Sequence, residues 1–484
     1  MADQQDVDAA VASSRAALPG WSQKAPTERA SILLKFADLL EREAQTIGEL
    51  EAVCGVKPLN IFLAIELPLA ARAFRYFAGW CDKIPGESFP VSNGFYKIVQ
   101  REPIGVCASI TAFNEPIYGM AASLAPCLAA GCTMIIKPSM KSPLSTIYMG
   151  KLANEAGLPH GVLNIIPGGP ITGGLLATHM DINYITFTGG LQAGKEVSRL
   201  AAISNLKRVK LELGGKSPSL IFADANLDVA IPWCVNGINL LSGQVCSASS
   251  RVYVHESVKN EVINRMKVEF EAMEGKFGNP LDKTTGYGPL VDKAHFDRVT
   301  EMIERGTAEA TLVTGGKPVF EKGYWMRPTI FVDPAPDAEV YQEEIFGPVV
   351  VISSFSDEED VIARANQSKY GLAGAVFTQD INRAMRLASA ISSGTVGINC
   401  CSVFDPSVPC GGLRQSGFGR RNGKVCNYSS SHDCFFSFAV LEHALTIDLQ
   451  EGLLEYTETK TIFLKYVIPF RYKEKVFLEN TNME

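Results

Sequence analysis

The chain has 484 residues, more than one hydrophobic core ordinarily supports, so we expect two or three domains. Its formal net charge is −7 without any basic block, which argues against nucleic acid or an acidic membrane surface as the main partner. We find no stretch typical of a membrane span or a secretory signal. The twelve cysteines follow no metal or disulfide spacing. We therefore expect a cytoplasmic protein that binds neither nucleic acid, membrane nor metal.

The N-terminal part predicts helices followed by a hairpin. Residues 4–55 have the apolar spacing of two amphipathic helices separated near Pro26, and a third helical stretch covers about 60–82. Residues 88–102 instead alternate apolar and polar side chains around Ser92-Asn93-Gly94. This alternation is typical of a β-hairpin.

Beyond residue 104, short apolar runs alternate with helical segments. The strands expected first are 106–111, 133–137, 162–166, 184–188 and 209–213. A second series of the same kind follows Gly214-Gly215 and ends near residue 415. Because strands that alternate with helices form parallel, doubly wound sheets, the sequence predicts an α/β fold.

Two segments contain residues suited to nucleophilic and base catalysis. Cys246 lies in the small, polar segment GQVCSASSR, where a thiolate is accessible, although most isolated cysteines serve only in packing. Glu212 lies between two leucines in LELGGKSP, on an expected buried strand. Burial raises the pKa of a carboxyl group toward that of a general base, but a pairing with lysine explains this segment equally well.

Two further segments lie where a strand ends. Asn114 follows the first strand in ITAFNEPIYG, where its amide can donate to a developing oxyanion, although asparagine is common in turns. FTGGLQAG (187–194) closes a strand and opens a helix, and its glycines permit a pyrophosphate to approach the helix N-terminus. Its spacing is not the GxGxxG fingerprint, so the motif alone is weak.

Taken together, these four segments resemble the aldehyde dehydrogenase superfamily in their order and separations. EEIFGPVV (343–350), Asn399 after GTVGI and PCGGLRQSGFGR (409–420) extend the resemblance, which covers about residues 5–424 and 451–466. It implies an aldehyde dehydrogenase-like fold with a Rossmann-type cofactor domain, an α/β catalytic domain and a small β oligomerisation unit.

The resemblance also implies domain limits and an assembly. Residues 1–87 and 103–214 correspond to the cofactor domain, and 215–420 to the catalytic domain. Residues 88–102 and 455–467 correspond to the oligomerisation strands of a homodimer or homotetramer.

The same resemblance implies roles for single residues. Cys246 attacks the aldehyde, Asn114 and the Cys246 N–H hold the oxyanion, and Glu212 activates the water that hydrolyses the thioester to the carboxylic acid. The cofactor is NAD or NADP. The residues implied to contact the cofactor are Lys137, Ser139, Met140, Thr188, Gly189, Gly190, Glu344 and Phe346.

The sequence departs from the family pattern at the cofactor site. Met140 stands where NAD-preferring members usually have a glutamate, and Lys141 follows it. Neither side chain repels a 2′-phosphate, so we expect NADP to serve at least as well as NAD.

The presumed substrate pocket departs from the pattern too. Several of its side chains are smaller than in well-studied members, so we expect a bulky or aromatic aldehyde. The residues expected to line this pocket are Glu115, Gly119, Ala122, Leu240, Phe404 and Cys410. Arg421 replaces a frequent glutamate, and we interpret it as a solvated side chain rather than a partner of Glu115.

Residues 425–450 interrupt the family pattern. Their deletion leaves GRRNGK-EGLLEYTETKTI, which reads as a continuous family C-terminus. The segment has a whole number of codons and permits splice-site sequences at both ends, so we interpret it as a translated intron. The alternative is a functional insertion. On the intron interpretation, Lys424 and Glu451 lie near each other and the segment makes few long-range contacts.

Two rival functions remain for the whole chain. A CoA-acylating dehydrogenase typically lacks the base, so Glu212 argues against that activity. A non-catalytic protein with the same fold has no need to keep Cys246, Glu212 and Asn114 together.

Overall fold

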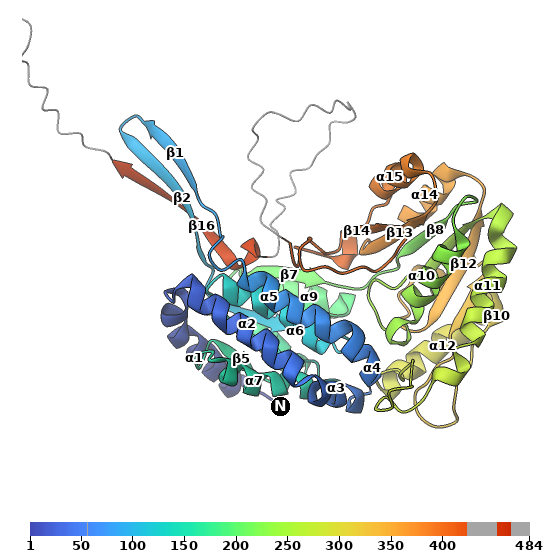
Figure 1. Ribbon diagram of the computed structural model, residues 1–484, viewed down its shortest axis with the longest axis horizontal. Coiled ribbons are helices and arrows are strands. Elements are labelled where there is room, and N and C mark those ends of the chain that lie inside the picture. The colour runs from blue at the N-terminus through green and yellow to red at the C-terminus, as the bar shows by residue number, and fades with distance from the viewer. Residues whose placement is uncertain (56, 424–452, 466–484) are drawn as a thin grey trace, which may run out of the picture.

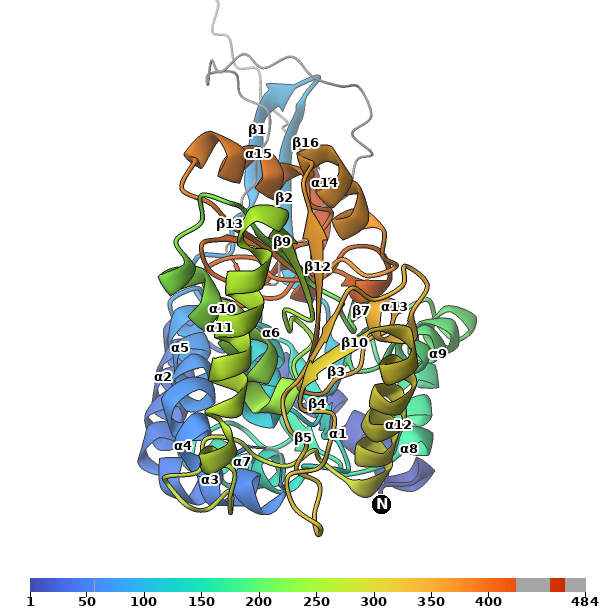
Figure 2. The same cartoon turned by 90° about the vertical axis from the view of Figure 1, so that its right-hand side faces the viewer.

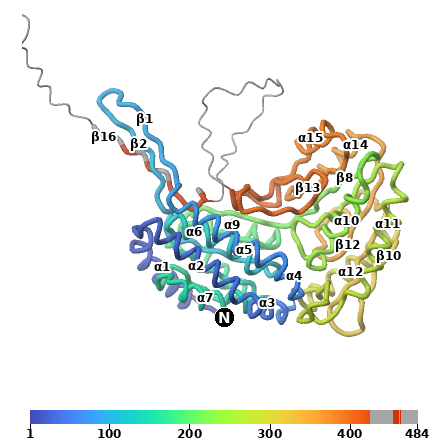
Figure 3. Tube along the Cα trace, in the orientation of Figure 1, coloured from blue at the N-terminus to red at the C-terminus, as the bar shows by residue number. Residues whose placement is uncertain are grey.

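The computed structural model describes residues 1–55, 57–423 and 453–465. One lobe surrounds a six-stranded sheet and the other a seven-stranded sheet. A three-stranded arm protrudes from the first lobe (Figure 1). The tube in Figure 3 shows that the described segment near the C-terminus (red) runs along this arm.

Helices at the N-terminus form the outer layers of the first lobe. The second of the two helices predicted within residues 4–55 is in fact broken at Glu43, which caps one helix and precedes the next. A π-helical turn interrupts the stretch predicted at 60–82. These elements are α1 (Gln4–Ser22), α2 (Pro26–Arg42), α3 (Ala44–Val53), α4 (Leu59–Ile61), η1 (Phe62–Glu66) and α5 (Leu67–Ala78).

The six-stranded sheet has the order β15-β7-β6-β3-β4-β5, and β15 is its antiparallel strand. Its strands are β3 (Val106–Ile110), β4 (Thr133–Lys137), β5 (Leu163–Ile165), β6 (Tyr184–Thr188), β7 (Arg208–Glu212) and β15 (Gly417–Phe418). The order reverses direction between β3 and β6. In such sheets, ligands bind beyond the carboxyl ends of the strands at that point.

Helices cover both faces of this sheet (Figure 2). One face packs against α6 (Pro116–Ala129) and α7 (Leu144–Ala156), with α2 and α5 outside them. The other face packs against α1, α8 (Pro170–Thr178) and α9 (Leu191–Ile203). The strands are buried on both sides, which explains their continuous apolar runs in the sequence.

The second lobe repeats this layered plan. Its sheet has the order β10-β11-β12-β9-β8-β13-β14 and is parallel except for β10. The strands are β8 (Pro218–Ile221), β9 (Arg251–His255), β10 (Thr311–Thr314), β11 (Thr329–Val332), β12 (Val349–Phe355), β13 (Ala373–Phe377) and β14 (Thr395–Ile398). The α-helices are α10 (Leu227–Asn239), α11 (Lys259–Glu271), α12 (Lys293–Glu309), α13 (Glu339–Gln342), α14 (Glu358–Asn366) and α15 (Ile381–Ala390). The 3-10 turns of the chain are η2 (Leu240–Gly243), η3 (Glu256–Val258), η4 (Glu274–Lys276), η5 (Arg414–Ser416) and η6 (Leu454–Tyr456), of which η6 packs on the first lobe. The α/β fold class is confirmed.

The arm consists of the predicted hairpin and a strand near the C-terminus. β1 (Glu87–Ser92) pairs antiparallel with β2 (Phe95–Pro103), and the turn falls at Asn93-Gly94. β16 (Thr457–Lys465) pairs with the other edge of β2 along its whole length. Segments that are far apart in sequence therefore share one sheet.

The residues just before β16 attach to the first lobe through buried polar contacts. Glu455 accepts hydrogen bonds from the Tyr184 hydroxyl (2.7 Å) and the Arg420 N–H (2.7 Å). The Lys210 ammonium lies 3.5 Å from the same carboxylate and is 1% exposed. Because Lys210 is on β7, the segment before β16 is anchored directly to that strand.

Residues 424–452 and 466–484 lie outside the described residues, so the translated-intron interpretation of 425–450 stays a prediction. The described residues on either side of the first gap are in contact, through Arg420 and Glu455. Within the described residues, no helix is both long and apolar enough to cross a membrane.

The buried contacts of Glu455 predict a large effect on stability. Glu455→Ala leaves the Lys210 ammonium buried without its anion, and we expect the free energy of unfolding to fall by about 3 kcal/mol. The matched control is Glu458→Ala, which removes the exposed ion pair with Arg208 and should cost less than about 1 kcal/mol. Denaturant unfolding of both variants measures this difference, and equal losses would contradict the prediction.

Candidate active site

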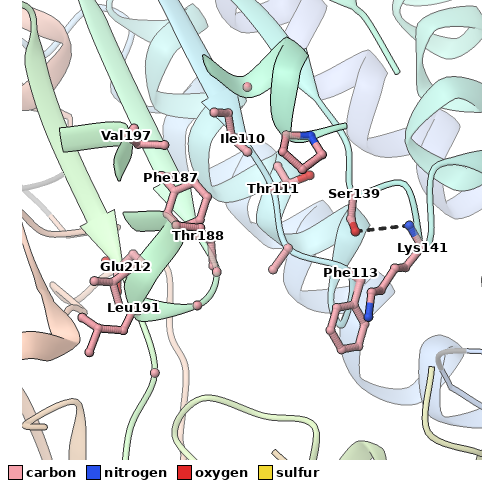
Figure 4. Close-up of a pocket in the computed structure, with 18 of the residues that line it drawn as sticks. Ile110, Thr111, Phe113, Ser139, Lys141, Phe187, Thr188, Leu191, Val197 and Glu212 are labelled. Carbon is pink, nitrogen blue, oxygen red and sulfur yellow. Dashed lines mark hydrogen bonds between the residues drawn. The ribbon is translucent and has the colours of Figure 1, made fainter. Parts of the chain in front are cut away.

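A cavity of about 1030 Å³ lies between the two lobes, at the carboxyl ends of β3 and β6. Its walls come from both lobes. Figure 4 shows Phe187, Thr188 and Glu212 on one side and Ser139, Lys141 and Phe113 on the other. All the residues predicted for catalysis and cofactor contact line it: Asn114, Glu212, Cys246, Lys137, Ser139, Met140, Thr188, Gly189, Gly190, Glu344 and Phe346.

Asn114 and Cys246 come from different lobes and meet at this cavity. The Asn114 Nδ2 donates to the Gln244 carbonyl (2.9 Å), two residues before Cys246. The buried Gln244 side chain donates to the Leu241 carbonyl (3.0 Å) and accepts from the Val291 N–H (3.0 Å). These bonds fix the loop that presents the thiol. The second amide hydrogen of Asn114 is left for an oxyanion beside Cys246.

Glu212 is the last residue of β7 and is buried. Its Oε1 has no hydrogen-bond partner among the described residues. Burial raises the pKa of Glu212, whereas the positive charges of Arg421 and Lys210 lower it. A buried carboxylate with an unused oxygen at the edge of a cavity has the properties of a general base for water.

The Cys246 thiol is surrounded by carboxylates. Burial raises its pKa above the usual range, and the negative charges of Glu115, Glu344 and Glu212 raise it further. Arg421 acts in the opposite direction. In this state of the site the thiol is mostly protonated at neutral pH.

The other end of the cavity has the chemistry that a dinucleotide needs. The buried Lys137 ammonium donates to the Gly168 carbonyl (2.7 Å) and the Pro138 carbonyl (3.0 Å), which leaves one hydrogen for a ligand, and burial lowers its pKa to about 8. Helix α9 begins after Gly190 without a side-chain cap, and a Cβ on Gly190 would meet nothing within 4 Å. Phosphate oxygens fit such an uncapped helix N-terminus.

A carboxylate and an aromatic cluster define the wall from the second lobe. Glu344 accepts a hydrogen bond from the Gly215 N–H (3.0 Å), and burial raises its pKa to about 7. Its other oxygen is available for a ribose hydroxyl. Phe346 has a left-handed backbone (φ 57°), and its carbonyl is hydrogen-bonded to His295. Its ring packs edge-on against Phe113. Sequence reasoning did not identify His295 or Phe113.

Met140 and Lys141 lie at the rim of the cavity. The Met140 side chain is 52% exposed. The Lys141 ammonium pairs with Asp292 (2.8 Å) and lies over the Phe113 ring. Position 140 at the rim of the cavity therefore has no carboxylate that would repel a 2′-phosphate. The Lys141 ammonium beside it is already paired with the carboxylate of Asp292.

The residues predicted for the substrate pocket do not line this cavity. Glu115, Gly119 and Ala122 belong to the start of α6 or its cap, and Ala122 is buried (1% exposed). A Cβ on Gly119 would meet nothing within 4 Å, so this position faces open space. Leu240 packs on the core of the second lobe, and the Phe404 ring lies against the Tyr118 ring. The backbone of Cys410 is hydrogen-bonded to that of Arg421.

The interpretation of Arg421 as a solvated side chain was wrong. Its guanidinium donates to the Thr188 hydroxyl at the end of β6, and its Nε is buried. The backbone N–H of Arg421 donates to the Cys410 carbonyl, and the Arg421 carbonyl accepts from the Cys410 N–H. β15 pairs with β7 at Glu212, so the chain after it passes over the site and takes Arg421 inside. The structure shows no ion pair between Arg421 and Glu115 in the part of the chain that it describes.

A doubly wound sheet with a thiol, an amide donor and a carboxylate base at its switch-point cavity defines a dinucleotide-dependent oxidoreductase. The aldehyde dehydrogenase family model matches residues 1–431. Retinal dehydrogenase 2 of Homo sapiens is 41% identical over 96% of this chain and 85% of its own length. Aldehyde dehydrogenase 1A1 of Ovis aries is 40% identical over 96% and 88%.

Solved structures agree with this match. The NAD+ complex of an aldehyde dehydrogenase from Bacillus cereus is 38% identical, with a TM-score of 0.88 over 96% of this chain and 89% of that one. The chain therefore belongs to the aldehyde dehydrogenase family. It is an enzyme that oxidises an aldehyde to the carboxylic acid with NAD or NADP.

The raised pKa of Cys246 predicts its reactivity without cofactor. Alkylation of Cys246 by iodoacetamide, followed by mass spectrometry, should be slow at neutral pH. Its rate should keep rising with pH beyond the point at which the alkylation rate of an ordinary cysteine reaches its plateau. Glu115→Gln removes one carboxylate and should accelerate alkylation about threefold to tenfold on the alkaline side, where Glu115 is charged. Glu102→Gln on the arm is the control. A rate unchanged by Glu115→Gln would contradict this account.

Proposed function

We propose that Cys246 is the nucleophile of this aldehyde dehydrogenase, Asn114 its oxyanion donor and Glu212 the base that activates water. The observation that carries the proposal is the convergence of these three side chains at one end of a single cavity. Lys137 and Glu344 at the same cavity supply the polar groups for a dinucleotide. Glu212 favours hydrolysis over transfer of the acyl group to CoA.

The residues act in a fixed order. The Cys246 thiol first loses its proton to a base, and the thiolate attacks the aldehyde carbon while the Asn114 amide and the Cys246 N–H donate to the resulting oxyanion. Bound NAD or NADP supplies the acceptor for the hydride that leaves this adduct. Glu212 then removes a proton from water, the water oxygen bonds to the thioester carbon, and the carbon–sulfur bond breaks to release the acid.

Substitution of the nucleophile and of the base should separate the two halves of the reaction. Cys246→Ala should abolish turnover, because no covalent adduct can form. Glu212→Gln should form about one equivalent of reduced cofactor per site and then stall at the thioester. Rapid-mixing absorbance measures the first equivalent, and mass spectrometry of the quenched protein detects the acyl group on Cys246.

Cys400→Ala is the control, since Cys400 is half-buried and does not line the cavity. Substantial dehydrogenase activity in Cys246→Ala would overturn the assignment of the nucleophile. Unimpaired steady-state turnover in Glu212→Gln would overturn the assignment of the base.

We also propose that NADP serves at least as well as NAD. Met140 at the rim neither accepts from a 2′-hydroxyl nor repels a 2′-phosphate. Met140→Glu should lower kcat/KM for NADP by about tenfold or more and affect NAD little, because a carboxylate repels the phosphate. Met180→Glu, at an exposed methionine outside the cavity, is the control. A hundredfold preference of the unaltered enzyme for NAD, about 2.7 kcal/mol, would contradict the proposal.

For the substrate, we propose a bulky or aromatic aldehyde. Gly119 faces open space, and the rings of Tyr118 and Phe404 lie 6.4 Å apart beside the same helix. Retinal dehydrogenase 2, one of the relatives, is named for retinal. A higher kcat/KM for acetaldehyde than for aromatic or polyene aldehydes would contradict this proposal.

We further propose a homodimer or homotetramer formed through the arm, in the cytoplasm. The arm protrudes from the lobes and exposes Phe89, Val91 and Phe95 (Figure 1). All ten cysteines in the described ranges are free thiols, which suits a reducing compartment. We propose the domain limits that the resemblance implies, with β15 of residues 215–420 contributing a strand to the sheet of the first lobe. A monomer in light scattering would contradict the assembly.

A further inference from the structure

Arg421 is a partly buried cation without a direct ion-pair partner among the described residues. Its guanidinium donates to the Thr188 hydroxyl, and its Nε is enclosed without a hydrogen-bond acceptor among the described residues. No described carboxylate lies within ion-pair distance of it. Because a buried charge is costly unless other charges compensate it, the negative groups of the site must stabilise Arg421 across longer distances.

Glu212 has the opposite charge to Arg421, and its side chain is buried. Its Oε1 is buried without a partner in the described structure. Thr188, which anchors the guanidinium, lies directly opposite Glu212 in the pairing of β6 with β7. On the other side of β7, Gly417 of β15 pairs with Glu212, four residues before Arg421. The hydrogen bond to Thr188 thus places the guanidinium near the end of β6, next to Glu212 at the end of β7.

The charged and titratable groups around Glu212 come from several elements. Arg421 has the largest effect of them, ahead of Lys210 on the same strand, Glu455 before β16, and Arg420. The thiols of Cys246 and Cys410 also interact with its charge. Lys210 is paired with Glu455, so its charge is largely neutralised there. Arg421 is therefore the main source of uncompensated positive charge at the base.

We propose that Arg421 is a positioning residue for hydrolysis of the thioester, whose positive charge beside the end of β7 keeps Glu212 in its carboxylate form. The proposal rests on the function proposed above. In the step concerned, water gives its proton to Glu212 and its oxygen to the acyl carbon, and the sulfur of Cys246 leaves. Only the anionic form of Glu212 can take that proton.

The electrostatic role has a definite sign. The positive charge of Arg421 lowers the pKa of Glu212 against the effect of burial, so its removal raises that pKa. Hydrolysis needs the deprotonated base, and its rate falls as the pH drops through this pKa. The low-pH side of the pH–rate profile, here called the acid limb, therefore moves to higher pH when Arg421 is removed.

The test compares two substitutions at Arg421 with one at its neighbour. Arg421→Met removes the charge and keeps an unbranched apolar chain, whereas Arg421→Lys keeps the charge. Arg420→Met is the matched control, because the Arg420 guanidinium donates to the Gly412 and Gly419 carbonyls and affects Glu212 least among the cations around it. Thermal unfolding confirms that each variant is folded. Steady-state rates and the first-turnover burst are then measured across the pH range.

In Arg421→Met we expect the steady-state rate to fall about tenfold at pH values on the acid limb, as loss of a nearby opposite charge implies. The rate should recover at higher pH, and the burst should approach a full equivalent of reduced cofactor because the thioester accumulates. Arg421→Lys should restore most of the rate at those pH values, and Arg420→Met should shift the acid limb less.

Any of three results would overturn the proposal while leaving the nucleophile and base assignments intact. The first is an acid limb of folded Arg421→Met at the same pH as in the unaltered enzyme. The second is a burst that falls in proportion to the steady-state rate, and the third is an equal shift of the acid limb in Arg420→Met. If Arg421→Met does not fold, Arg421→Gln gives the same reading. Activity of Cys246→Ala would instead remove the proposed function itself.

Discussion

The hydrogen bond from the Asn114 amide to the Gln244 carbonyl joins the two lobes at the point where their chemistry must coincide. Asn114 follows β3 in one sheet, and Gln244 precedes β9 in the other. The roles proposed for Cys246 and Asn114 require that the separation of these two groups be fixed to a fraction of an ångström. This hydrogen bond is one of the contacts that fix the two lobes relative to each other at the cavity.

The segment that carries Asn114 is held in position by further buried polar contacts. Glu66, at the end of the π-helical turn η1, accepts hydrogen bonds from the Ile117 and Tyr118 N–H groups (2.8 and 2.9 Å) in the first turn of α6. The buried Lys57 pairs with Glu66 and with Glu51 (3.1 Å). The carboxylate satisfies helix-end N–H groups that Glu115 leaves uncapped, so the loop that presents Asn114 has a defined position.

Much of this arrangement could be predicted from the sequence. The alternation of apolar runs and helices predicted the parallel sheets, and Asn93-Gly94 predicted the hairpin, because both depend on local periodicity and turn chemistry. Cys246, Glu212 and Asn114 stand in segments whose residue types suit their proposed roles, and the cavity brings them together.

The missed features depend on contacts between distant segments. Arg421 lies among glycines and polar residues, which locally indicate a solvated loop, and its burial follows from the pairing of β15 with β7. Glu66 gives no local sign that it caps a helix about fifty residues later in the chain. The break at Glu43 was not visible because the apolar spacing continues through it. The substrate pocket was inferred from side-chain size alone, which does not fix where each residue points.

The segment from Leu453 to Lys465 has a consequence for how the molecule is made. It supplies the Glu455 contacts to Tyr184 and Lys210 and the outer strand of the arm, although both belong to the first lobe. The ribosome must complete the second lobe before this segment emerges. Until then, Lys210 and Tyr184 have no carboxylate, and β2 has a bare edge open to pairing with other chains. These buried contacts of the first lobe and the third strand of the arm can therefore form only after this late segment has been synthesised.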